Sequence, residues 1–209
     1  MPNTDTPFGL RPIRHRNGAA YNGAANPYYI PASYATALFI GDAVVKTGTS
    51  NTAYVEAASV GGFQPGCLPE INRAAAGDGN RITGVIVGFA ALPSNLDVKH
   101  NPASTERVAL VCDDPDVIFE IQADGTVAAA SVGLNAVLIY THAGSAFTGM
   151  SGAELDTTSD VPAADASNQL LILRAANRAD NDIASANSKW EVLINQHTEG
   201  QGTVGSLGI

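Results

Sequence analysis

The chain has 209 residues and a formal net charge of -9, from 11 Lys and Arg against 20 Asp and Glu. Nonspecific phosphate binding needs clustered Lys and Arg, so this balance argues against direct contact with nucleic acid or with an anionic membrane. Only 15% of the residues are charged and 45% are hydrophobic. Such a composition suits a protein that buries part of its surface against neighbouring molecules.

Residues 1–36 are predicted to form an extended N-terminal arm, because five prolines fix φ and remove hydrogen-bond donors: Pro2, Pro7, Pro12, Pro27 and Pro31. The arm is rich in tyrosine and arginine, which are enriched where proteins meet partners. The candidate partner-binding residues are Phe8, Leu10, Arg11, Arg14, Tyr21, Tyr28, Tyr29 and Tyr34. The residues leave two roles open, contact with a neighbouring subunit or a strap over the chain's own body.

Residues 37–199 are predicted to form a β-rich body. Short apolar or alternating runs bounded by turn residues place strands at 38–40, 43–47, 53–57, 82–89, 108–112, 117–122, 137–140, 170–173 and 190–194. Around the centre of 117–122, Phe119 and Ile121 point one way while Glu120 and Gln122 point the other, which predicts a half-buried strand. The run 82–89 is nearly continuous in apolar residues and is expected to be buried on both faces.

The connections are predicted as follows. The strand at 53–57 pairs back on 43–47, residues 93–106 and 143–168 form long loops, and the Ala-rich segment 128–134 is a helical candidate. Residues 200–209 have too little apolar content to fold alone and are expected to be a flexible tail. Many short strands separated by turns favour an all-β fold, an antiparallel β-barrel or sandwich.

Motifs for chemistry are missing from the sequence. Zinc and redox spacings, H-E-x-x-H, G-x-S-x-G and the phosphate-binding loop do not occur, and the four histidines lie far apart, at His15, His100, His142 and His197. The cysteines, Cys67 and Cys112, are expected to be buried thiols without a disulfide. We therefore expect no enzyme activity, no catalytic residue and no cofactor.

The acidic turns are interpreted as solvated rather than as metal sites. Asp113, Asp114 and Asp116 are interrupted by Pro115, and neither they nor the acids near residue 180 match a calcium-loop pattern. Trp190 is expected in the core. The N-terminus lacks the basic-then-apolar order of a signal peptide, and no apolar run reaches the roughly 20 residues of a membrane helix, so synthesis in the cytoplasm is expected.

The order of several segments resembles structural proteins of tailed bacteriophages. The segments are T-P-F-G-L-R-P-I-R-H-R-N-G-A, A-N-P-Y-Y-I-P, L-F-I-G-D-A-V-V-K, I-T-G-V-I-V-G-F, D-D-P-D-V-I-F-E-I-Q-A-D and W-E-V-L-I-N-Q-H. Nearly the whole chain is covered, and the motifs are packing and turn patterns rather than catalytic signatures. The similar proteins are head decoration, cement or auxiliary capsid proteins.

This resemblance implies a β-barrel or jelly-roll-like body that forms a homotrimer, or a dimer, on the exterior of the phage head. There it would bind the major capsid protein, with residues 6–34 as the clamping arm. The best-known small decoration proteins are shorter, so the loop at 143–168 and the long arm are not explained by them. The alternatives are a phage tail or baseplate component and a carbohydrate-binding or hydrolytic β-sandwich.

Overall fold

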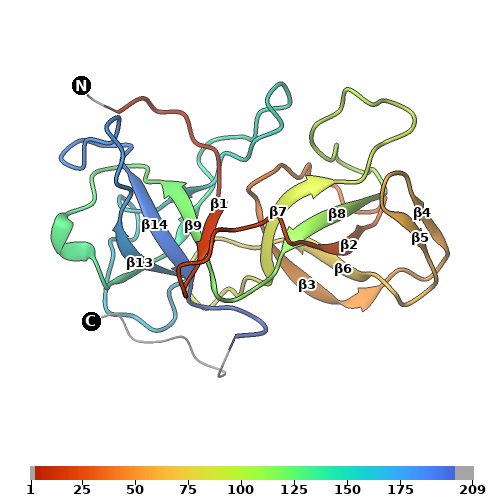
Figure 1. Ribbon diagram of the computed structural model, residues 1–209, viewed down its shortest axis with the longest axis horizontal. Coiled ribbons are helices and arrows are strands. Elements are labelled where there is room, and N and C mark those ends of the chain that lie inside the picture. The colour runs from red at the N-terminus through yellow and green to blue at the C-terminus, as the bar shows by residue number, and fades with distance from the viewer. Residues whose placement is uncertain (1–2, 201–209) are drawn as a thin grey trace.

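The computed structural model describes residues 3–200 of the chain, which form an all-β fold of mainly antiparallel strands in two lobes (Figure 1). This confirms the predicted fold class. The first lobe contains a five-stranded antiparallel sheet, here called sheet A. Its strands, in spatial order, are β1 (Arg11–His15), β9 (Val117–Gln122), β14 (Lys189–Ile194), β13 (Leu170–Ala175) and β10 (Asn135–Ala136).

The second lobe is a ring of five strands, here called the strand ring. Its order is β2 (Asn26–Ile30), β6 (Pro69–Arg73), β3 (Ala43–Ser50), β7 (Gly84–Phe89) and β8 (Arg107–Cys112). The ring closes because β2 pairs with β8 on one side and with β6 on the other. The contact to β6 is a single parallel pair, Tyr29 with Glu70, so the closure is a ring with one weak seam rather than a uniformly bonded barrel.

Two short strand pairs and one 3-10 turn complete the structure. The pairs are β4 (Val55–Ala57) with β5 (Gly61–Phe63), and β11 (Leu138–Ile139) with β12 (Glu154–Leu155). The turn is η1, Ala129–Ser131. Across residues 3–200, the structure contains no helix with the length and hydropathy needed to cross a membrane.

Several local predictions are wrong for reasons of pairing. The helix expected at 128–134 is reduced to the one turn η1. The strand at 53–57 pairs with the strand that follows it, β5, not with β3. The expected strand at 38–40 makes only isolated bridges, and the loop expected at 143–168 contains β12, because residues there pair with distant segments.

The expected N-terminal arm is part of both lobes. Its strand β1 forms the edge of sheet A beside β9, and β2 closes the strand ring (Figure 1). Leu10, Tyr28 and Ile30 are buried in the chain's own core. Within the described residues the segment therefore straps its own body, whereas contact with a partner remains a prediction. The tail expected at 200–209 lies, apart from Gly200, outside the described residues.

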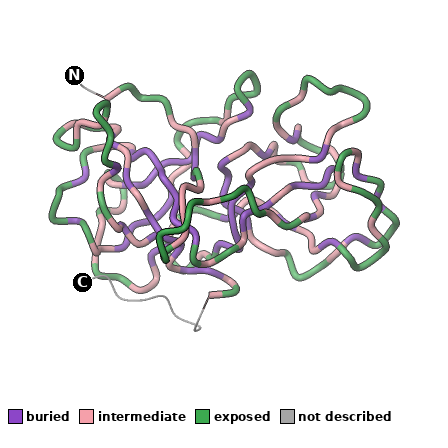
Figure 2. Tube along the Cα trace, viewed as in Figure 1, coloured by how far each residue is buried: buried purple, intermediate pink, exposed green. Residues whose placement is uncertain are grey.

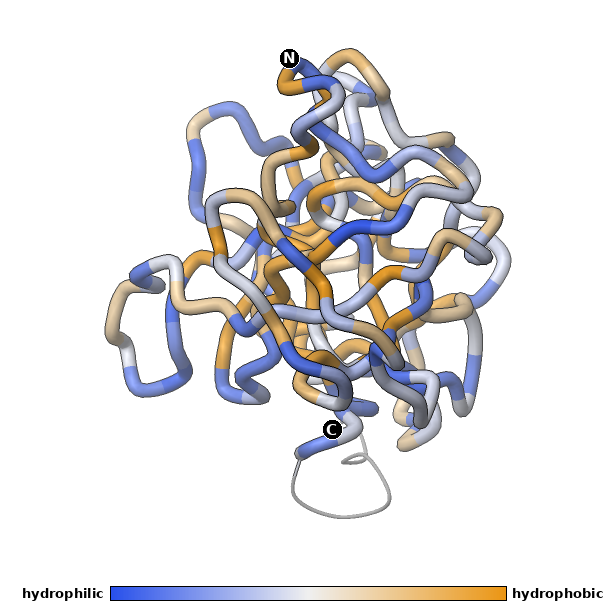
Figure 3. Tube along the Cα trace, turned by 90° about the vertical axis from the view of Figure 1, so that its right-hand side faces the viewer, coloured by the Kyte–Doolittle hydropathy of each residue, from blue (hydrophilic) through white to orange (hydrophobic). Residues whose placement is uncertain are grey.

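The main hydrophobic core joins the two lobes. Its largest cluster contains Ala43 and Val85 from the strand ring together with Phe119 and Trp190 from sheet A. Phe119 and Trp190 are fully buried, as predicted for Trp190. Figure 2 shows buried backbone concentrated in the strands, and Figure 3 shows hydrophilic residues along the outer loops.

Strand β9 is buried on both faces, so the prediction of a half-buried strand is wrong. Glu120 and Gln122 are 5% and 0% exposed. Side chains from other segments cover both residues, as described below. The alternation of polar and apolar residues within the strand contains no information about these distant segments. The opposite error occurs in β7, which was predicted to be buried on both faces. Its first three residues are buried, but its last three are partly exposed.

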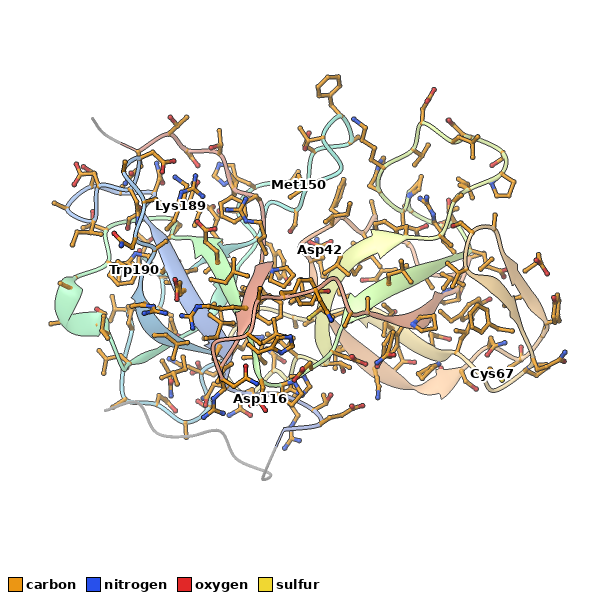
Figure 4. The ribbon with its side chains drawn as sticks, viewed as in Figure 1. Asp42, Cys67, Asp116, Met150, Lys189 and Trp190 are labelled. Carbon is orange, nitrogen blue, oxygen red and sulfur yellow. The ribbon has the colours of Figure 1, made fainter. Side chains whose placement is uncertain are left out.

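The two cysteines are free, as predicted. Cys112 is buried, but Cys67 is exposed, which corrects the expectation of two buried thiols. Cys67 lies at the outer end of the strand ring, far from Trp190 in sheet A (Figure 4).

Candidate interaction surface

The candidate residues of the N-terminal segment do not form one surface. Leu10 and Tyr28 are buried, Arg11 is exposed, and the others, Phe8, Arg14, Tyr21, Tyr29 and Tyr34, are partly buried. Those before residue 15 lie on or near sheet A, and those from residue 28 onward lie on or near the strand ring.

The tyrosines of this segment are used inside the chain. The hydroxyl of Tyr28 donates to Asp113 at 2.8 Å, that of Tyr29 donates to Glu106 at 2.8 Å, and that of Tyr34 accepts from the backbone N–H of Arg73 at 3.1 Å. Burial and these carboxylates raise the pKa of Tyr28 and Tyr29, the latter to about 12. Of the eight candidates, only Arg11 is exposed.

Arg11 and Arg14 share the outer face of sheet A because β1 is bulged. In a regular strand, residues three apart point to opposite faces. The register between β1 and β9 shifts between Pro12 and Arg14, and such a bulge inserts the extra residue that returns Arg14 to the side of Arg11. A similar shift in β13, between Ile172 and Arg174, precedes Arg174.

The pairing register then aligns charged residues in a row across the sheet. Arg11 on β1 lies opposite Glu120 on β9, Glu120 lies opposite Glu191 on β14, and Glu191 lies opposite Arg174 on β13. Two glutamates therefore occupy the middle of the sheet with an arginine on each flank. We call Arg11, Arg14, Glu120, Arg174, Arg178 and Glu191 the arginine face.

Each glutamate is bound by two arginines. Glu120 accepts from Arg11 and, at 3.0 Å, from Nη1 of Arg178. Glu191 accepts from Arg14 and, at 2.7 Å, from Nε of Arg174. Arginine suits this geometry because its planar guanidinium presents several donors in fixed directions.

The arginine face presents mainly positive charge to solvent, and its one exposed acidic partner among the described residues is Asp180, which accepts from Arg178 at 2.9 and 3.0 Å and is 59% exposed. The side chains of Glu120 and Glu191 are 6% and 13% exposed, whereas those of Arg11, Arg174 and Arg178 are 47%, 57% and 40% exposed. Burial alone would raise the pKa of Glu191, but hydrogen bonds and charge from Arg174 and Arg14 outweigh it and lower that pKa. Glu191 is therefore held as an anion beneath the guanidinium groups of Arg14 and Arg174.

The acidic turn after β8 is bound to the end of β1. His15 contacts Asp114 at 3.2 Å and Arg16 contacts Asp116 at 3.3 Å, and an open hollow of about 570 Å³ lies between them. Asn26 and Tyr28 both bind Asp113. The sequence had predicted that these acids are only solvated. In the structure, side chains of the N-terminal segment bind them.

A second cluster combines Asp5, His142 and Glu154. One potential ligand atom from each lies within 4.8 Å of the others. Sequence reasoning missed this cluster, because Asp5 is distant in the chain from His142 and Glu154 and the three residues belong to no spacing motif. They meet because the segment before β1 places Asp5 beside Gln122 of β9 and His142 of the β11–β12 connection.

Comparison with family models, with curated proteins and with solved structures found no match to the chain.

Proposed function

We propose that the chain is a structural virion protein, a decoration or cement protein that binds the outside of a tailed-phage head and stabilises contacts between major capsid subunits. Support comes from the sequence resemblance and from the all-β fold with its arginine face. The role is one of binding and includes no chemical step.

The observation that carries the proposal is a preorganised positive face on an acidic chain. The whole molecule has a formal net charge of -9, yet four arginines gather on one face of sheet A over two mostly covered glutamates and next to one exposed carboxylate, Asp180. Arginine is enriched at protein interfaces, and guanidinium groups already fixed by hydrogen bonds lose little side-chain entropy on binding. The fitting partner is an acidic surface on a capsid subunit.

The predicted self-association fits this role. A dimer or trimer would place several arginine faces on one particle, and linked weak contacts bind together more strongly than any one alone. Binding to assembled subunits in preference to free ones would stabilise the shell by linkage. The remaining negative charge would keep free copies soluble and apart before they reach the head.

The test mixes purified protein with empty heads of the phage that carries the gene. Bound copies are counted after sedimentation, and their position is determined by cryo-electron microscopy. We expect saturable binding on the head exterior that weakens as salt is raised, because exposed charges are screened. Protein located on tails or baseplates, or protein that does not bind particles at all, contradicts the proposal.

A double variant, Arg11→Gln with Arg174→Gln, tests the arginine face. Each glutamate keeps one arginine, Arg178 or Arg14, so the fold should survive while two exposed charges disappear. We expect at least about tenfold weaker head binding, equivalent to about 1.4 kcal/mol.

The matched control removes the same charge elsewhere. Arg16→Gln with Lys99→Gln takes two positive charges from outside the arginine face and should bind heads like the parent protein. Equal loss of binding in both double variants would show that net charge, not this face, is responsible.

A further inference from the structure

The cluster of Asp5, His142 and Glu154 is built from three parts of the fold, and Gln122 links them from a fourth. Asp5 lies in the segment before β1, His142 follows β11, and Glu154 lies in β12, where it pairs with Ile139. Gln122 at the end of β9 links them: its amide nitrogen lies 3.2 Å from Oδ1 of Asp5 and 3.4 Å from Oε1 of Glu154. The backbone N–H of Thr6 donates to the oxygen of the same amide at 3.4 Å.

The buried member of the cluster is Glu154, whose side chain is 0% exposed. Its Oε2 contacts Nδ1 of His142 at 2.8 Å and accepts from the hydroxyl of Thr141 at 3.3 Å. On the other side of the imidazole, Nε2 of His142 lies 3.6 Å from Oδ2 of Asp5. One imidazole therefore stands between two carboxylates, and nothing else that carries positive charge contacts them in the part of the chain described.

The charge balance of this cluster favours a cation. A protonated imidazole neutralises only one of the two carboxylates, whereas a divalent cation neutralises both. Glu154, the buried carboxylate, already faces His142, and Asp5 is 48% exposed, so the case for a cation rests on the three potential ligand groups that lie within 4.8 Å of one another.

We propose that Asp5, His142 and Glu154 bind one divalent cation of the zinc type. Zinc takes imidazole nitrogen and carboxylate oxygen as ligands at about 2.0–2.2 Å and is usually four-coordinate. One ring nitrogen of His142 and one oxygen from each carboxylate supply three ligands, and water completes the fourth position. Binding replaces the hydrogen bond between His142 and Glu154, and the imidazolium releases its proton to solvent as the metal enters.

The cation can reach the site from solvent. The side chains of Asp5 and His142 are 48% and 46% exposed, so these two ligands form the open side, while the enclosed Glu154 forms the floor. Gln122 would not touch the metal but would orient the carboxylates of Asp5 and Glu154 through its amide nitrogen. Residues that hydrogen-bond to metal ligands commonly have this role.

The metal would fasten the segment before β1 to the body. That segment is otherwise held by a few polar contacts, among them Asn3 with the backbone carbonyls of Asp182 and Ala186. A ligand that binds only the folded arrangement stabilises it. The cation should therefore protect residues 3–9 from local opening without any need for a phage particle.

The test uses the full chain after treatment with a chelator and titrates ZnCl₂ by isothermal calorimetry near neutral pH. We expect about one equivalent to bind in the micromolar range. In parallel, Co²⁺ should give the visible absorption of a four-coordinate site. Hydrogen exchange should show zinc-dependent protection of residues 3–9.

Two single variants and one control make the test specific. Asp5→Asn and His142→Gln alter exposed side chains and should leave the fold intact by circular dichroism. Each should weaken zinc binding by about 100-fold or more, since loss of an outer-layer partner alone costs about 10–100-fold. The control is His15→Gln, which removes a histidine that faces a single nearby carboxylate, Asp114, and zinc binding should not change.

Three results would overturn the site. They are the absence of saturable zinc binding, binding that Asp5→Asn and His142→Gln leave unchanged, and binding abolished by His15→Gln. Stabilisation of residues 3–9 by lower pH but not by zinc would also overturn it, because a proton on His142 would then be the occupant.

Discussion

Glu120 on β9 and Glu191 on β14 lie directly opposite each other in sheet A. Like charges opposite one another destabilise a sheet, and both side chains are largely covered. The pair is tolerated because each carboxylate is held by two of the four arginines of the arginine face. The bulges in β1 and β13 bring Arg14 and Arg174 to this face. They therefore help β9 and β14 to accommodate Glu120 and Glu191.

Removing both arginines from one glutamate should destabilise the fold. In Arg11→Met with Arg178→Met, the apolar stems remain but Glu120 loses both of its cations, and the exposed pair of Arg178 with Asp180 is lost as well. We expect the free energy of unfolding in urea to fall by about 1–3 kcal/mol, the usual cost of an unsatisfied buried polar group. The control is Arg16→Met, which removes the exposed pair with Asp116 and should change stability little. Equal effects would mean that the network adds no more than a surface pair.

Acid should weaken the same network through Glu191. Its pKa is lowered in the folded protein, so its contribution to stability is full above the ordinary value of 4.5 and is lost as the pH falls through the folded-state pKa. Urea unfolding measured between pH 6 and pH 3, a range chosen to span about 4.5, should show a shallower decline for Glu191→Gln than for the parent. Glu56→Gln, at an exposed position of β4 outside the arginine face, is the matched control, and equal slopes for the two variants would contradict the assignment.

Phe119 should be among the most sensitive core positions. Its side chain is fully buried in the cluster that joins the two lobes, so Phe119→Ala should lower the free energy of unfolding by about 3–5 kcal/mol. Phe147→Ala provides the matched control, because that ring is 86% exposed, and should leave stability nearly unchanged. A small effect at Phe119 would place its ring outside the core.

Gly41 should be sensitive for a different reason, the close passage of the N-terminal segment. It has φ +95°, and a Cβ there would lie 2.5 Å from the carbonyl oxygen of Phe8. Gly18 has a similar φ, +90°, with nothing within 4 Å of its Cβ position. Gly18→Ala should therefore cost about 1 kcal/mol of backbone strain, and Gly41→Ala should cost at least about twice that. Thermal unfolding of the two variants separates backbone strain, which both share, from the contact with Phe8, which only Gly41→Ala makes. Equal losses of stability would argue against that contact.

Local pattern was sufficient to predict most of the strands. The alternating or continuous apolar runs at 108–112, 117–122, 170–173 and 190–194 coincide with β8, β9, β13 and β14. The burial of Trp190 and Phe119 followed as well. These predictions succeeded because strand periodicity and turn residues are properties of neighbouring positions.

Pairing between distant segments decided the rest. The amino acids of the N-terminal segment predicted an arm, but its strands fill the edge of sheet A and close the strand ring. The arginines share a face through bulges that are defined by register with another strand.

The sequence by itself therefore determined that the chain is all-β, acidic and rich in turns, since each of these depends on composition or short-range order. Only the tertiary structure decided which polar residues meet. Asp5 from the N-terminal segment meets His142 and Glu154 only in the folded chain, and no spacing along the chain encodes such a contact.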